Sequence, residues 1–156
     1  MSMPSVLPIA LALALTPPLA GAPVVTGPFS SYLLDCPCRL LDTRTVVDGR
    51  IVDEDNHGWR VQENCGVPLG AAAVIVNVTV TGALGPGFLS LWAAGAPRPA
   101  TSTVNFGAGQ TVANGSTVRL RQLPTRPMPV YDLEGFAHVE GGGGLDMVID
   151  VVGYLQ

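Results

Sequence analysis

The sequence contains no lysine: all eight basic residues in its 156 positions are arginine. The chain therefore has no Schiff-base lysine, no P-loop lysine and no means of forming an internal Lys–Asn isopeptide crosslink. Charged residues make up only 13% of the chain, and the net charge is -4. Nucleic acid is excluded as a partner on this ground, because phosphate binding requires a positive field.

Residues typical of catalytic sites are also scarce. Histidine occurs only at His57 and His138, and no G-x-S-x-G nucleophile elbow accompanies them. The only clustered carboxylates lie together at positions 53–55. No motif supplies a nucleophile, a base and an orienting acid, so we predict a protein that is not an enzyme and uses no cofactor.

An apolar run, Val6–Ala22, stands near the N-terminus. Three prolines interrupt it, and it is short for a membrane span. Because the run ends in the small residues Ala20-Gly21-Ala22, we expect residues 1–22 to be a signal peptide and residues 23–156 to form the mature domain, although no Lys or Arg precedes the run. A retained membrane anchor and an N-terminal strand are the alternatives. The expected location is secreted or at the cell surface, with membrane contact only through an uncleaved leader.

The chain is rich in Gly (19) and Pro (14), and 47% of it is hydrophobic. Apolar and polar residues alternate in several stretches, which predicts one all-β domain, an antiparallel β-sandwich or jelly roll. Two of these stretches, Ala71–Thr81 and Phe88–Ala93, are expected to form a hairpin around Gly-Pro-Gly at 85–87. The longest predicted strand is Leu145–Leu155, with Gly153 allowing close backbone approach. The other predicted strands are 39–42, 58–62, 101–106, 116–123, 128–133 and 136–139.

Three cysteines, Cys36, Cys38 and Cys65, fit an exported protein with one disulfide and one remaining thiol. Cys36 and Cys38 flank a single proline and are poorly placed to bridge each other, so Cys65 pairs with one of them. From the residues alone, both Cys36 and Cys38 remain possible partners of Cys65. Three buried thiols are the alternative, and a zinc site is disfavoured because the chain has no second closely spaced Cys pair.

Three charged residues, Asp42, Arg44 and Asp150, lie in or beside apolar stretches. A charge placed in such a strand must be paired to be tolerated. We therefore predict a structural ion pair or hydrogen-bond network that links Arg44 to Asp150 or Asp42. On this view, replacing Arg44 with Met strongly destabilises the fold.

Two groups of residues are candidates for ligand binding. Trp59, Trp92 and Tyr131 would form a glycan-stacking platform if they shared an exposed face, whereas aromatic residues on strands more often pack in the core. Asp53 and Asp55 begin a stretch that resembles a calcium loop, but the fifth and twelfth positions of that stretch are not suitable ligands. We expect no metal, and a solvated acidic loop at this position.

An ordered series of short motifs runs along the chain. It resembles a β-rich module of exported bacterial proteins, found in actinobacteria and acidobacteria, often appended to surface enzymes or repeated in tandem. The resemblance implies a β-sandwich-type domain at the cell surface with Cys38 and Cys65 paired, and this is the pairing we adopt. It brings no established activity. The motifs are CRLLDTR (38–44), CGVP (65–68), NVTVT (77–81), GAPRP (95–99), TSTVNF (101–106), GQTVAN (109–114) and DVVGY (150–154).

Cys36 departs from this pattern, and it is either an intermolecular disulfide partner or an idle thiol. The function expected is that of a secreted, non-enzymatic structural or adhesive module that assembles with copies of itself. The alternative is a carbohydrate- or cell-wall-binding module that uses the three aromatic residues. Coplanar, solvent-facing rings would favour a cell-surface glycan as the partner, whereas buried rings beside a bare strand edge would favour assembly.

Overall fold

The computed structural model describes residues 28–46, 49–122 and 131–156, and these ranges contain no α-helix. Consequently no helix in them is long and apolar enough to cross a membrane. A single turn of 3-10 helix, η1 (Thr43–Thr45), follows the first strand. The strands are β1 (Ser31–Asp42), β2 (Ile51–Val52), β3 (Asn56–Trp59), β4 (Ala73–Thr81), β5 (Gly87–Ala93), β6 (Val104–Phe106), β7 (Val112–Arg119), β8 (Leu133–Val139) and β9 (Gly144–Leu155).

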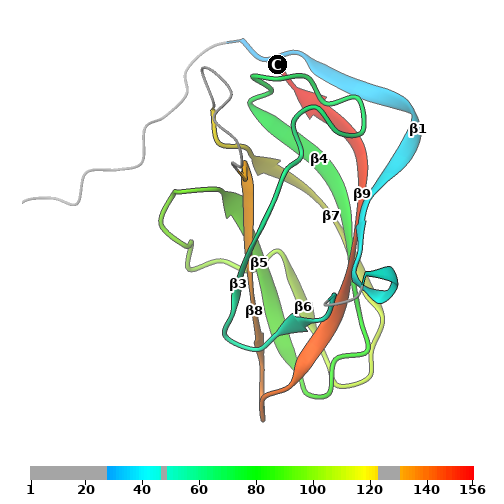
Figure 1. Cartoon of the computed structure of the whole chain (residues 1–156), viewed down its shortest axis with the longest axis vertical. Coiled ribbons are helices and arrows are strands. Elements are labelled where there is room, and N and C mark those ends of the chain that lie inside the picture. The colour runs from blue at the N-terminus through cyan, green and yellow to red at the C-terminus, as the bar shows by residue number, and fades with distance from the viewer. Residues whose placement is uncertain (1–27, 47–48, 123–130) are drawn as a thin grey trace, which may run out of the picture.

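Two antiparallel sheets pack face to face, which confirms the predicted β-sandwich (Figure 1). The first sheet has the order β1-β9-β4-β7, and the short β2 pairs with the start of β9. The second sheet has the order β3-β8-β5-β6. Between them lies one apolar cluster to which both sheets contribute.

The connectivity is that of a jelly roll. Apart from β2, the first strand pairs with the last, β3 with β8, β4 with β7 and β5 with β6. The chain thus forms one long antiparallel ribbon, and successive pairs of this ribbon fall alternately in the first and second sheets. A ribbon wound around a core in this way is the jelly-roll arrangement of a double-sheet sandwich.

The core follows from the alternation in the sequence. Every second residue of β4 and β9 points into the sandwich, while the residues between them face outward. Gly153 of β9 has the role predicted for it, because a side-chain carbon there would lie 2.4 Å from the Tyr32 carbonyl oxygen of β1. The fully buried side chains of these two strands are Val74, Val76, Val78, Val80, Leu145, Met147, Ile149 and Val151.

The expected hairpin between β4 and β5 is wrong. β4 lies between β7 and β9 in the first sheet, whereas β5 belongs to the second. A tight hairpin requires a short loop of about two to five residues in a suitable turn type. Here residues 82–86 lead the chain across from one sheet to the other, so Gly-Pro-Gly marks a crossing.

The two short strands expected at 128–133 and 136–139 are also not observed as such. Residues 128–130 lie outside the described residues, and Leu133–Val139 is one continuous strand. Gly135 had suggested a break. Its place in the strand is explained by packing, because a side-chain carbon there would lie 2.7 Å from both the Trp59 ring and Leu91.

The remaining differences concern strand ends. The first strand begins at Ser31 and not at 39, and the third covers 56–59 in place of 58–62. The sixth strand is only Val104–Phe106, and the seventh is 112–119 and not 116–123. Most of these errors fall on edge strands, which lack a clear apolar pattern because solvent reaches both faces.

Candidate functional site

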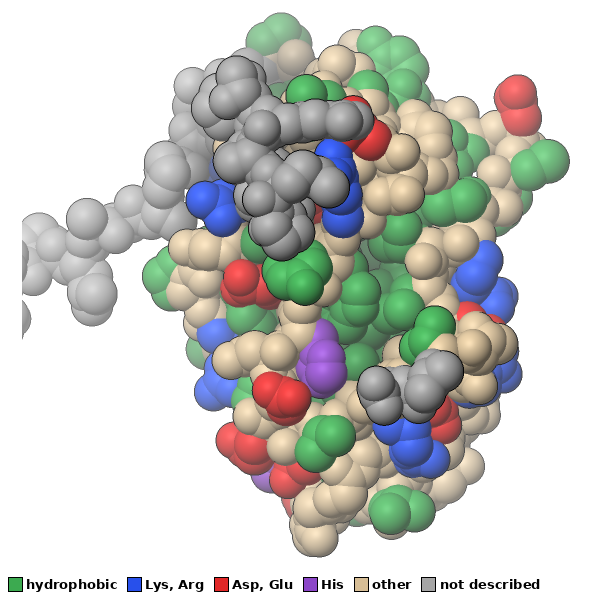
Figure 2. Space-filling view, viewed as in Figure 1, with side chains coloured by type: hydrophobic (Ala, Val, Ile, Leu, Met, Phe, Trp, Pro, Cys, Tyr) green, Lys and Arg blue, Asp and Glu red, His purple; other side chains and the backbone are tan. Residues whose placement is uncertain are grey.

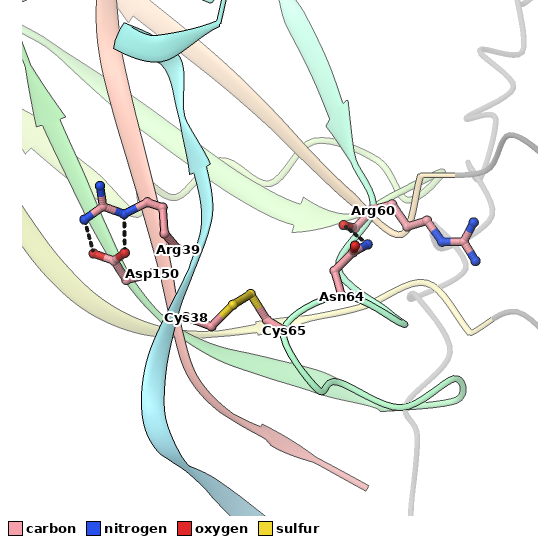
Figure 3. Close-up of a disulfide and its surroundings, with 6 residues drawn as sticks. All are labelled: Cys38, Arg39, Arg60, Asn64, Cys65 and Asp150. Atoms are coloured by element: carbon pink, nitrogen blue, oxygen red, sulfur yellow. Dashed lines mark hydrogen bonds and ion pairs between the residues drawn. A yellow bond between two sulfur atoms is a disulfide. The ribbon is translucent and has the colours of Figure 1, made fainter.

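A disulfide joins Cys38 of β1 to Cys65 in the segment before β4, with the two Cα atoms 5.5 Å apart. The adopted pairing is therefore confirmed. Cys36 is a free, exposed thiol. The bridge ties the edge of the first sheet to the segment that leads from β3 into β4 (Figure 3).

β1 leaves its regular pairing close to this thiol. Leu33 pairs with Gly153 and Cys38 with Val151, so four residues of β1, 34–37, lie opposite one residue of β9. Such a bulge breaks the ladder and twists an edge strand. Cys36 lies inside the bulge.

The predicted charged network exists on the outer face of the first sheet. Arg44 Nη2 lies 2.6 Å from Asp42 Oδ2, which confirms that pairing. Asp150 does not contact Arg44 directly but binds Arg39 through both carboxylate oxygens (Figure 3). Arg39 also contacts Asp42, at 3.0 Å, and so connects the two carboxylates. Sequence reasoning missed Arg39, although it lies within the CRLLDTR motif.

The two arginine side chains face solvent, contrary to the burial on which the prediction rested, whereas the Asp42 side chain beneath them is only 11% exposed. The Arg44 side chain is 53% exposed. Hydrogen bonds from Arg44, with the charges of Arg44 and Arg39, lower the pKa of Asp42 to about 2. Hydrogen bonds to the carboxylates raise the pKa of both arginines. The network is thus ionised at neutral pH and stays hydrated.

A second polar group surrounds Thr43, the first residue of η1. Thr43 is buried, and its Oγ1 accepts the Met147 N–H at 2.8 Å and donates to Asp146 Oδ1 at 3.2 Å. Arg50 contacts Asp146 at 3.3 Å and donates to two backbone carbonyls. An open cavity of about 600 Å³ lies beside them. The polar side chains that line it already hold β2 and η1 against β9.

The most deeply buried charged group is Asp132, which no sequence motif indicated. Its side chain is fully buried, and its two oxygens accept the N–H groups of Val61 (2.7 Å) and Gln62 (2.8 Å). Burial raises the pKa of this carboxyl, while the two backbone hydrogen bonds oppose the shift. Its backbone carbonyl accepts from Ala94 and Arg121, so one residue joins three segments.

The three aromatic candidates do not share a face. Trp92 is 8% exposed, and its indole N–H has no hydrogen-bond partner in the part of the chain that the structure describes. Trp59 packs against the core over Gly135. Tyr131 is 53% exposed and lies against Gly58. Only Tyr131 is open to a glycan.

Asp53 and Asp55 point to different partners and do not form a calcium loop. Asp53 accepts the Val139 N–H at 2.7 Å, and Asp55 accepts the adjacent Asn56 N–H. Asp53 and Glu54 instead approach His138, whose Nδ1 lies 2.8 Å from Glu54 Oε1. Ligand atoms of these three residues lie within 4.8 Å of one another. The arrangement is a surface cluster of two acids and a histidine.

A groove of about 760 Å³ opens along the other edge of the sandwich, just before β6 begins and where β5 faces β7. Leu91 and Trp92 border it from β5, and the 96–103 loop closes one side. Val118 and Leu120 contribute apolar surface from β7 and its end. Arg119 and Arg121 add two guanidinium groups. None of the sequence motifs predicted this groove.

Elsewhere, on the face that Figure 2 shows, acidic and basic side chains are interspersed and apolar side chains gather in the middle.

The geometry defines a disulfide-linked jelly-roll β-sandwich with long exposed edges. No protein-family model, curated protein or solved structure matches the chain. The resemblance to the exported bacterial module therefore stays a prediction.

Proposed function

We propose that this chain is an exported, non-enzymatic structural or adhesive module that assembles through the edges of its first sheet. One observation carries the proposal: the first sheet ends in a long exposed strand on each side, β1 with 12 residues and β7 with eight. Edge strands present rows of backbone donors and acceptors to another chain, and on β1 the bulge at residues 34–37 interrupts this row.

The residues of these edges support assembly. Most side chains of β1 from Ser31 to Pro37 are exposed, and so are the residues of β7 from Ala113 to Gly115. No lysine protects either edge, although charge from lysine is a common device against edge pairing. The Cys38–Cys65 disulfide supports the export half of the proposal, because such bonds persist in oxidising compartments.

Glycan binding is less well supported. A stacking platform needs two or three aromatic faces open to solvent, and Trp59 and Trp92 are instead packed within the fold. The exposed ring of Tyr131 alone is a small contact area for a sugar chain.

The test uses the whole chain, produced by a secreting bacterial host with its own N-terminus. We expect the protein in the medium, with cleavage near residue 22 by mass spectrometry, and concentration-dependent growth in size by light scattering. A Cys36→Ser variant assembles equally well if the strand edges drive association. Retention in the cell would contradict export. A monomer at every concentration, or binding of the monomer to isolated cell walls, would contradict assembly.

A further inference from the structure

The groove beside β7 has a mixed lining, with apolar side chains such as Leu91, Val118 and Leu120 beside hydroxyl and amide groups and two arginines. Among the described residues that line it there are two arginines and no carboxylate, in a chain with a net charge of -4. Arg121 lies against Gly95, where an added side-chain carbon would be 3.6 Å from its Nη1. Glu134 accepts the Gly95 N–H, and no ion pair joins it to Arg121 within the described ranges. The groove therefore matches an apolar segment that carries an acidic residue.

The outer edge of β7 offers backbone groups to such a segment. Leu120 donates its N–H to Ala72, and β7 pairs in regular antiparallel register with β4. Because pairing groups alternate along a strand, Gly115 and Thr117 direct their N–H and C=O groups away from β4. An extended segment laid beside β7 would find a ladder of donors and acceptors as well as the groove.

The opposite edge of the same sheet carries a segment of this kind. Ser30 pairs with Gln156 through two backbone hydrogen bonds, so Leu33 directs its backbone groups away from β9. Its side chain is 76% exposed, the highest value among the exposed large hydrophobic side chains of the described residues. Asp35, two positions further on, is exposed and has no ion pair in the described ranges.

We propose that the Leu33–Asp35 segment of one copy pairs along β7 of a second copy, which places Leu33 in the groove and Asp35 beside Arg121. This inference rests on the proposed function and names the residues through which two copies would make contact. Leu33 is exposed at the last regular pair before the bulge, and Asp35 is exposed inside the bulge, so one segment presents the apolar and the acidic group together. Since β1 and β7 are opposite edges, the contact is heterologous and extends to an open filament.

The test is a reciprocal charge reversal in a Cys36→Ser background, which removes thiol-linked dimers. Asp35→Arg and Arg121→Asp are prepared separately, with Glu140→Arg, an exposed acid outside both surfaces, as the matched control. Each reversal places like charges at the contact and weakens assembly by about tenfold or more, as read by light scattering. The control assembles as its parent does. Circular dichroism melting verifies that every variant is folded.

An equimolar mixture of the two reversed proteins is decisive. The altered strand of one matches the altered groove of the other, and their unaltered surfaces still match, so the mixture assembles as the parent does. If the reversed proteins assemble alone, or the mixture stays monomeric while the parent assembles, this contact is wrong and edge assembly stands. If the parent itself is monomeric, both the contact and the proposed function fail.

Discussion

The segment 60–65 and the outer face of the β1–β9 pair lie on opposite sides of the Cys38–Cys65 bridge (Figure 3). On the first side, a buried carboxylate, Asp132, binds two backbone N–H groups. On the second, Asp42 and Asp150 bind arginine side chains in contact with solvent. The comparison shows that similar carboxylates differ in their contribution to the free energy of unfolding. Water can replace a lost hydrogen-bond partner on the surface but not in the interior.

The largest effect is expected from Asp132→Ala. Two buried N–H groups would lose their acceptor, and at roughly 1–3 kcal/mol each the loss of unfolding free energy is about 4 kcal/mol. Urea denaturation measures it. Asp132→Asn is expected to lie between the wild type and the alanine variant, because its amide retains one acceptor oxygen. Asp55→Ala, at an exposed carboxylate, is the control, and equal losses at both sites would invalidate the comparison.

The bridge between the two regions comes next in size. Removing it with Cys38→Ser and Cys65→Ser together releases a loop of 27 positions. The unfolded chain gains entropy, and the expected loss is about 3 to 4 kcal/mol in the chain-entropy model. Thermal or urea unfolding measures this. Cys36→Ser is the matched control and leaves stability unchanged, since that thiol is exposed and unbridged.

The pH dependence of stability separates the two carboxylates by sign. Asp42 has a pKa lowered from 3.8 to about 2, so its stabilising effect is complete above pH 4 and is lost as pH falls toward 2. Asp132 has a raised pKa, and its protonation on acidification acts in the opposite direction. The free energy of unfolding of the wild type and of Asp42→Asn, plotted as two curves against pH between pH 6 and pH 2, isolates the contribution of Asp42. The two curves should converge at low pH, and parallel curves would contradict it.

The smallest effect is expected from Arg44→Met. The sequence suggested strong destabilisation, but the side chain is half exposed, and water and Arg39 remain available to Asp42. Surface ion pairs contribute little, so the melting temperature should fall by a few degrees at most. A loss of unfolding free energy as large as that of Asp132→Ala would show that the outer network stabilises the fold as strongly as a buried network does.

The sandwich could be predicted because every second residue is apolar in β4 from Val74 to Val80 and in β9 from Leu145 to Val151. Their inner faces are fully buried, and burial imposes that pattern on the sequence. β7 could not be placed accurately, because most of its residues are exposed and such an edge strand needs no apolar pattern, and β6, at three residues, is too short to show one. Gly135 suggested a break for the same reason that it packs well: it has no side chain.

The candidate site was predictable only where its partners are close in sequence. Asp42 and Arg44 are two positions apart, and their pairing followed directly. Asp132 binds backbone groups 70 and 71 positions away, and backbone donors leave no trace in residue identity. The groove beside β7 likewise depends on where β6 begins, which no local pattern specifies.

The position of β9 has a consequence for the order of events during synthesis. This strand follows the other eight strands in the sequence, yet it lies between β1 and β4 in the first sheet. Until residues 144–155 leave the ribosome, β1 has no neighbour and β4 lacks one of its two. The first sheet is therefore completed only when residues 144–155 are in place, and it depends on contacts between segments that lie far apart in the sequence, such as β1 with β9.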